Sequence, residues 1–354
     1  MSNLTLSLRT ITGIAIATIL AQPLAGCSGA SSSLPVATAS QSSAHFDMPA
    51  AANAQGSAAQ RVSPDKKGGQ KLFVADVFNS KVYVFNAATK IDNPPAEYTI
   101  VNGISNPNGI ATDSSGNLWV ANLSSNTVTE YAQNSTSPEF TISNAMNGPV
   151  DVKVDGFGNV YVAMNGEYTH GVNTIVEYQA GTANPIYTWN VPQSNMQITG
   201  IALVNPTLKN ETSVYALESQ FNGSSAVGGL LSCFSGPYNE VCTQLTNYTY
   251  GQTGGITIAS QGGNNPFEFL AVDQYLPGID ETVSSPPSVK RLITGGTPEF
   301  VTLNAKGTRL FVADRFYGQV EQYGFPNGKK LHTFSVSGKT RLYGVATYPS
   351  GNFL

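Results

Sequence analysis

The sequence predicts an all-β fold, a six-bladed β-propeller with four-stranded antiparallel blades, and three observations predict it. First, the apolar run at residues 118–121 follows a polar turn at residues 113–117, as in a β-hairpin. Second, copies of this pattern recur about every 40 to 55 residues, the length of one propeller blade. Third, the C-terminal residues 344–353 repeat the start of the pattern at residues 109–118.

Each copy carries a continuous apolar run at its second strand, as expected for a strand buried between neighbouring blades. We assign these second strands to residues 72–75, 118–121, 160–163, 214–217, 269–272 and 310–313. Third strands are expected at 82–85, 128–131, 175–178, 279–283 and 320–323, and outer strands at 98–100, 140–142, 187–189 and 289–293. Aromatic residues share one second-strand position and are predicted to be core between blades: Phe73, Trp119, Tyr161, Tyr215 and Phe311.

The ends of the chain predict a closed ring. The first copy lacks an inner strand, because Lys71 already begins a second strand. We expect residues 342–354 to supply the missing inner strand. The two ends would then share one blade, which leaves the ring without a free edge.

The N-terminus is typical of an exported protein. Residues 1–27 form an export signal in which Arg9 precedes an apolar run at residues 11–20. The last four residues, Leu24-Ala25-Gly26-Cys27, resemble the lipobox of bacterial lipoproteins, so we expect Cys27 to carry lipid. An ordinary secretory signal with an incidental cysteine, or an uncleaved anchor, are the alternative interpretations.

The lipobox resemblance implies a location in the cell envelope, with the protein anchored by lipid to the outer membrane or the cell surface. Residues 28–69 are rich in Ser and Ala and lack an apolar period, so we predict a disordered tether there. The propeller would occupy residues 70–354. Removing Cys27 for lipid leaves Cys233 and Cys242, which flank a turn and are expected to form a disulfide.

Composition limits the partners. The chain of 354 residues has a formal net charge of -4 and only 11% charged residues. It carries no basic surface of the kind that follows a phosphate backbone, so nucleic acid is not an expected partner. We expect a monomer.

Acidic and amide residues end most of the second strands: Asp76, Asn122, Glu218, Asp273 and Asp314. We interpret them as structural, because such side chains accept backbone N–H bonds from a following loop. Asp113 and Asp155 are likewise expected to be hairpin-turn residues and not parts of a calcium loop.

The stretch from Asn108 to Asn122 resembles NHL-type repeats and the blades of the gluconolactonase/regucalcin family. NHL-like repeats imply a propeller used for binding. The gluconolactonase family implies a divalent metal over the central channel and lactone hydrolysis. Its ligand positions correspond here to Asn108, Val150, Thr199, Gly254, Glu299 and Tyr343. Only Asn108 and Glu299 carry suitable oxygens, so they are the candidate metal ligands. Otherwise we expect Asn108 to be a turn residue and Glu299 a solvated rim residue.

The blades also resemble streptogramin lyases, which implies catalytic His and Glu. The three histidines fall in the tether (His45), a loop (His170) and an outer strand (His332), and no catalytic set is apparent. The loops of blades three and four are candidate binding loops, with Tyr168, His170, Phe221 and Asn222.

We therefore expect a binding module without a cofactor, whose ligand is a protein, a glycan, a small molecule or another envelope component. A metal-dependent lactonase is the alternative, and a lyase is the weaker one.

Overall fold

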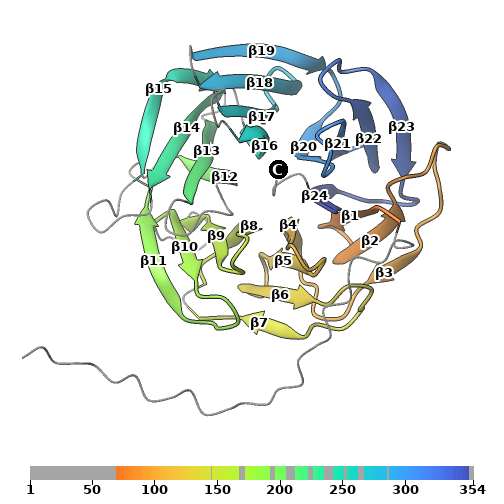
Figure 1. Ribbon diagram of the computed structural model, residues 1–354, viewed down its shortest axis with the longest axis horizontal. Coiled ribbons are helices and arrows are strands. Elements are labelled where there is room, and N and C mark those ends of the chain that lie inside the picture. The colour runs from red at the N-terminus through yellow and green to blue at the C-terminus, as the bar shows by residue number, and fades with distance from the viewer. Residues whose placement is uncertain are drawn as a thin grey trace, which may run out of the picture. The chain divides into compact units, whose positions relative to one another are not determined.

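The computed structural model describes residues 69–144, 146–166, 172–191, 196–204, 212–221, 226–234, 242–250, 253–261, 267–284 and 287–350. The predicted signal, Cys27 and nearly all of the predicted tether lie outside these ranges. The described residues form six four-stranded antiparallel sheets arranged around one centre, as predicted (Figure 1).

The strands of the six blades, from the centre outward, are as follows. Blade one has β24 (Leu342–Tyr348), β1 (Lys71–Asp76), β2 (Lys81–Asn86) and β3 (Tyr98–Ile100). Blade two has β4 (Pro107–Thr112), β5 (Leu118–Asn122), β6 (Thr127–Tyr131) and β7 (Phe140–Ile142). Blade three has β8 (Pro149–Val154), β9 (Val160–Met164), β10 (Thr174–Tyr178) and β11 (Pro185–Asn190).

Blade four has β12 (Gln197–Val204), β13 (Ser213–Phe221), β14 (Ala226–Phe234) and β15 (Thr243–Tyr250). Blade five has β16 (Thr253–Gln261), β17 (Phe267–Asp273), β18 (Gly278–Ser284) and β19 (Pro287–Thr294). Blade six has β20 (Pro298–Leu303), β21 (Arg309–Asp314), β22 (Gln319–Gly324) and β23 (Lys330–Ser335). Within the described ranges, no helix has the length and hydropathy needed to cross a membrane.

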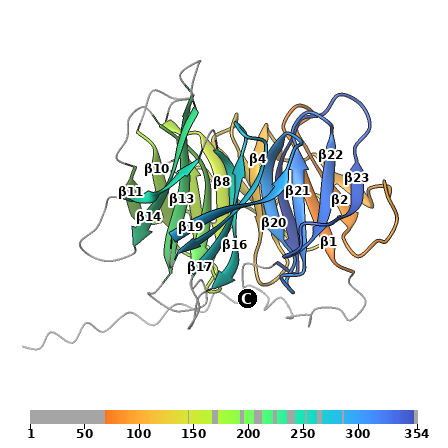
Figure 2. The same cartoon turned by 90° about the horizontal axis from the view of Figure 1, so that it is seen from above.

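The strands of each blade run between the two faces of the ring (Figure 2). On one face each second strand ends and each inner strand begins, as the pairing of Pro298 with Asp314 shows. We call this the entry face. On the opposite exit face, Asp113 and Asp155 hold tight hairpin turns by accepting backbone N–H bonds of 2.8 to 2.9 Å, as predicted.

The C-terminal strand closes the ring, as predicted. Strand β24 pairs antiparallel with β1, with Val345 opposite Val74. Thr347 ties this strand to both neighbouring blades. Its hydroxyl donates to the Leu303 carbonyl at 2.8 Å, and its own carbonyl accepts from the Thr112 hydroxyl at 2.7 Å.

Large side chains fill the spaces between blades. The aromatic residues predicted to share a second-strand position are all buried, as is Phe269 in blade five. Tyr215 and Phe269 pack against each other across the interface between blades four and five, with ring centroids 4.7 Å apart. Packing between blades is therefore the main apolar contribution to the fold.

A buried ion pair lies among the inner strands. The Lys153 ammonium donates to both carboxyl oxygens of Asp151, at 2.8 and 2.7 Å. Asp151 also accepts the backbone N–H groups of Val152 at 2.8 Å and of Ile201 at 2.9 Å, the latter from blade four. On the blade-two side only glycine fits, since a Cβ on Gly109 would lie 2.2 Å from the carboxyl oxygen of Asp151. Asp151 thus joins blades three and four by hydrogen bonds and packs closely against blade two.

Blade four differs from the sequence prediction in one respect. The Gly/Ser-rich stretch at residues 221–229 was expected to be a loop, but most of it extends the hairpin formed by β13 and β14. The predicted disulfide between Cys233 and Cys242 is confirmed, with a sulfur–sulfur distance of 2.01 Å and both residues buried.

Candidate binding face

The residues that end the second strands act mainly as acceptors for the turns that follow them. One oxygen of Asp76 accepts the backbone N–H groups of Phe78 and Asn79 at 3.1 and 3.2 Å. Asp273 does the same for the next turn residues in blade five, and Asp314 in blade six. The structural interpretation of these three carboxylates is confirmed.

Asn122 and Glu218 differ from these three. The Asn122 side chain accepts the Ser105 N–H, from the loop before β4, at 2.9 Å and donates to the Thr129 hydroxyl at 2.9 Å. The Glu218 side chain is fully buried, and within the described ranges neither carboxyl oxygen has a hydrogen-bond partner. Burial raises the pKa of Glu218 to about 7, because the charged form loses its hydration without compensation. Glu218 is therefore a destabilising group whenever it is ionised.

Replacing Glu218 with Gln should stabilise the protein at pH 8. The folded-state pKa lies above the unfolded value of 4.5, so the native state holds the extra proton and loses stability as the pH rises from about 4.5 to about 7. The shift corresponds to roughly 3 kcal/mol at most. Chemical denaturation of Glu218→Gln and wild type between pH 4.5 and 8 measures the difference.

The matched control is Glu139→Gln, because Glu139 is exposed. Burial also raises the pKa of Glu130, Glu177 and Glu299 to about 7, so some pH dependence should remain in the Glu218→Gln variant. A wild-type and variant pair that differ by a constant amount across this pH range would contradict the assignment.

A β-bulge marks the start of every inner strand, where its pairing with the second strand shifts. The bulge positions are the six at which the family resemblance places metal ligands: Asn108, Val150, Thr199, Gly254, Glu299 and Tyr343. Bulges are common next to functional sites, where they change the direction of a side chain. These six residues therefore stand at the positions where the family resemblance implies a site over the central channel. Asn108 was expected to be a turn residue, but it lies within strand β4, which corrects that interpretation.

Glu299 is buried and not a solvated rim residue, which corrects the sequence interpretation. Its carboxylate accepts a hydrogen bond from the Gln274 side-chain amide at 2.7 Å and lies 3.6 Å from the Arg315 guanidinium. Burial raises its pKa to about 7 although Arg315 and Arg341 oppose this shift. The prediction that Glu299 is exposed to solvent was wrong because Gln274 and Arg315, which enclose its side chain, come from other positions in the sequence.

Aromatic side chains project from the turns of three neighbouring blades on the entry face. Phe78, Tyr275 and Phe316, the turn aromatics, each stand two residues after the capping aspartate of their blade. Their exposed fractions are 62%, 53% and 62%, and those of Leu276 and Tyr317 are 63% and 70%. Exposed aromatic side chains at one repeated turn position of neighbouring blades make this face a candidate interaction site.

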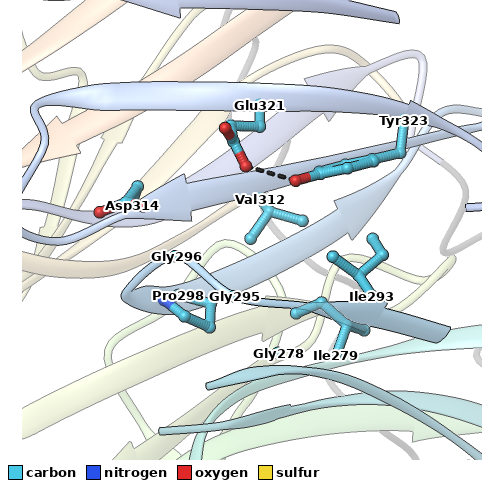
Figure 3. A pocket seen from close by; sticks show the side chains of 10 residues that line it. All are labelled: Gly278, Ile279, Ile293, Gly295, Gly296, Pro298, Val312, Asp314, Glu321 and Tyr323. Carbon is cyan, nitrogen blue, oxygen red and sulfur yellow. Dashed lines mark hydrogen bonds between the residues drawn. The ribbon is translucent and has the colours of Figure 1, made fainter. Parts of the chain in front are cut away.

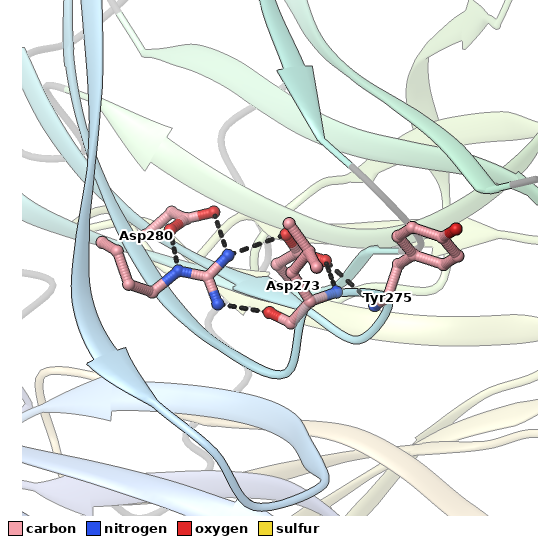
Figure 4. A network of polar contacts seen from close by, with 5 residues as sticks. Asp273, Tyr275 and Asp280 are labelled. Carbon is pink, nitrogen blue, oxygen red and sulfur yellow. Dashed lines mark hydrogen bonds and ion pairs between the residues drawn. The ribbon is translucent and has the colours of Figure 1, made fainter.

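The turn in blade five is held in place by Arg291 (Figure 4). The guanidinium donates to Asp280 at 2.6 Å, to Asp273 at 2.9 Å and to the carbonyl of Leu276. Tyr275 is therefore carried on a turn whose backbone is fixed at both ends. A fixed turn loses little conformational entropy when a ligand binds to it.

A narrow pocket between blades five and six has apolar walls that include Ile279 and Val312, and the carboxylates of Asp314 and Glu321 also line it (Figure 3). A second, more open cavity adjoins it and shares Asp314, Glu321 and Tyr323 with it. The volume of this second cavity is about 320 Å³, and Tyr317 and Gln319 also line it. The Tyr323 hydroxyl donates to Glu321, whose carboxylate also accepts from the Gln319 amide at 3.3 Å and pairs with Lys330. The cavity is thus lined by polar groups, with an exposed tyrosine at its edge.

The other sequence-predicted site residues fall elsewhere. Tyr168, His170 and Asn222 lie outside the described residues, and Phe221 ends strand β13. His332 lies in the outer strand β23, as expected, with an imidazole nitrogen 3.6 Å from Asp92. Among the described residues, no three His, Cys, Asp or Glu side chains gather as a metal-binding group.

Comparisons with known proteins place this ring among propellers. The family model described as SMP-30/Gluconolactonase/LRE-like region matches residues 51–139. No curated protein sequence matches the chain significantly.

Solved structures show the fold. A chain from a nidogen/laminin complex is 15% identical with a TM-score of 0.59, covering 79% of this chain and 98% of that chain. A Bacteroides caccae protein of unknown function is 13% identical with a TM-score of 0.53, covering 79% and 98%. Hydrazine synthase of Kuenenia stuttgartiensis is 13% identical with a TM-score of 0.50, covering 72% and 73%. The chain is a six-bladed β-propeller, and over residues 51–139 it resembles the SMP-30/gluconolactonase/LRE-like family, as the repeated hairpin had predicted.

Proposed function

We propose that this protein is a binding module of the cell envelope that holds its ligand on the entry face. The observation that carries the proposal is the presence of an exposed aromatic residue at the same turn position in blades five, six and one. Exposed aromatic rings on rigid turns supply large contact areas at a small cost in entropy. The six blades provide the rigid frame that positions these rings.

The anchor is the second part of the proposal. The lipobox resemblance at residues 24–27 supports lipid on Cys27, which would hold the protein to a membrane. The propeller begins at the exit face, because Lys71 is paired with Tyr348 and Asp76 lies at the entry face. Loss of palmitate labelling in Cys27→Ser would be the expected result.

A triple variant tests the binding face. Phe78→Ser, Tyr275→Ser and Phe316→Ser together should abolish ligand capture, measured with immobilised protein on glycan arrays and on solubilised envelope fractions. The matched control is Phe157→Ser, which removes a half-exposed aromatic side chain beside the Asp155 turn on the exit face. Capture that survives in the triple variant, with an unchanged melting temperature, would contradict the proposal.

The family match favours lactone hydrolysis as the second candidate. That activity needs a divalent cation, which takes six to eight oxygen ligands in the case of calcium. Of the six bulge positions only Asn108 and Glu299 offer suitable oxygens, and two guanidinium groups act on Glu299. The described residues therefore do not fit a hard cation at this mouth, and no hydrolytic step is derived through one.

Metal addition distinguishes the two candidates. Under the binding proposal, calcium or zinc should leave the melting temperature of the purified protein unchanged, and metal analysis should find no stoichiometric ion. A tightly held ion that raises the melting temperature would favour the hydrolase. A screen of lactones and esters with the metal-loaded protein would then follow.

A further inference from the structure

Two guanidinium groups flank one exposed ring on the entry face. The Arg315 guanidinium lies 5.1 Å from the centroid of the Phe316 ring and 5.3 Å from that of Tyr343. The Arg341 guanidinium lies 5.9 Å from the same Phe316 ring. Cation–π contacts of this length orient both groups around Phe316.

The positive charge of this pair is only partly matched. Arg315 faces the Glu299 carboxylate at 3.6 Å, beyond the length of a charge-assisted hydrogen bond, and its Nε is buried with no hydrogen-bond partner among the described residues. Arg341 is exposed, and within the described part of the chain its guanidinium makes no hydrogen bond. Two cations therefore act on the Glu299 carboxylate, and the exposed guanidinium of Arg341 has donors that remain for an anion.

The polar cavity lies on the other side of the same turn. Tyr317 stands at its edge with an exposed fraction of 70%, next in sequence to Phe316. The carboxylates of Asp314 and Glu321 line the cavity. Asp314 already accepts four hydrogen bonds, two from Thr297 and two from the N–H groups of the turn that follows it. Glu321 accepts from Tyr323 and Gln319 and pairs with Lys330, so of its about four acceptor sites one remains. This side of the turn can accept a hydroxyl group.

We propose that the turn of residues 315–318 binds an acidic oligosaccharide, one whose sugar units carry carboxylate groups. The inference rests on the proposed binding function and names the ligand class for that face. A carboxylate would take bidentate hydrogen bonds from Arg341, and the apolar face of a sugar ring would pack on Phe316 or Tyr317. A hydroxyl group of a neighbouring unit would donate to Glu321.

An anionic membrane surface is the competing source of negative charge, and the cavity argues against it. Aromatic and basic residues together are also typical of proteins that lie on lipid head groups. However, Asp314 and Glu321 oppose any anion inside the cavity, so the negative group must lie at Arg341 while an uncharged, hydroxyl-bearing part of the ligand lies over Glu321. A ligand that combines hydroxyl and carboxylate groups fits both sides of the turn.

The test is calorimetric titration of the full protein with tetramers of galacturonate, mannuronate and hyaluronan. At least one should bind, and Arg341→Gln and Phe316→Ala should each weaken it about tenfold or more. Methyl esterification of the tetramer should have a similar effect. The matched control is Lys306→Gln, which removes an exposed cation from the exit-face turn between β20 and β21 and should change nothing.

The opposite results are equally specific. Absence of binding by all three acidic tetramers at millimolar concentration would overturn the inference, as would equal binding of cellotetraose. Binding to phosphatidylglycerol vesicles that Arg341→Gln abolishes, without oligosaccharide binding, would assign the site to membranes. If the oligosaccharide inference fails, the binding function can still hold. It would be upheld if the wild-type protein captures a ligand and the triple variant of the turn aromatics does not. The failure of the inference and the failure of the proposed function are therefore distinguishable.

Discussion

Removal of residues 342–354 is expected to abolish the cooperative unfolding of the propeller. The deletion takes away β24, whose Leu342 and Val345 side chains are buried, and such side chains contribute about 1.5 to 3 kcal/mol each. It also strips β1 of one of its two hydrogen-bonded neighbours and removes both Thr347 bonds to blades two and six. The total loss is comparable to the whole stability of a typical domain. Calorimetry and guanidinium unfolding measure it.

Deletion of residues 351–354 alone is the control, because it leaves β24 complete. A synthetic peptide of residues 340–354 added to the truncated protein should restore the transition, since a missing strand can be supplied by a separate chain. An unchanged single transition in the protein lacking residues 342–354 would show that the ring does not depend on its closure.

Asp151→Ala is expected to destabilise the protein by about 3 to 5 kcal/mol, the usual cost of removing one partner from a buried ion pair. The variant leaves the Lys153 ammonium buried without its carboxylate, and the Ile201 N–H in blade four loses its acceptor. A drop in melting temperature on the order of 10 °C should follow. Differential scanning calorimetry at neutral pH is the measurement.

The double variant Asp151→Ala with Lys153→Met should recover much of this loss, because no uncompensated charge is left inside. Lys290→Met is the matched control, as Lys290 is exposed and lies 3.8 Å from Glu281, and exposed pairs contribute 0 to about 1 kcal/mol. If Asp151→Ala and Lys290→Met cost the same, Asp151 would not be a link between blades.

Most of the architecture could be predicted because each blade repeats one local pattern. The apolar second strands, the aspartate turns and the match between the C-terminus and residues 109–118 are all visible in the sequence. Strand lengths were less predictable. Glycine at positions 223, 228 and 229 suggested a loop, yet much of the segment pairs as a long hairpin, because pairing across a whole hairpin can outweigh the low strand preference of glycine.

The binding face was only partly predictable. The spacing of an aspartate and an aromatic two residues later was visible in three copies, and it would have identified Phe78, Tyr275 and Phe316. The surroundings of Glu299 were not visible, since Gln274 belongs to blade five and Arg341, which acts on its carboxylate, directly precedes β24 of blade one. Such contacts depend on how the blades curve around the centre, which local sequence patterns do not report.

The place of β1 within its sheet has a mechanical consequence. Strand β1 is bonded on both sides, to β24 and to β2, and the chain enters it at Lys71. A force applied through the preceding residues would therefore pull β1 along its own axis and would have to shear two ladders of hydrogen bonds at once. Loading at the C-terminal end of β24 would instead act on a strand bonded within its sheet to β1 only. Single-molecule pulling can compare two attachments, one at the N-terminal end and one at the C-terminal end, each against the same fixed site in the ring. The rupture force should be higher when the protein is pulled from its N-terminal end.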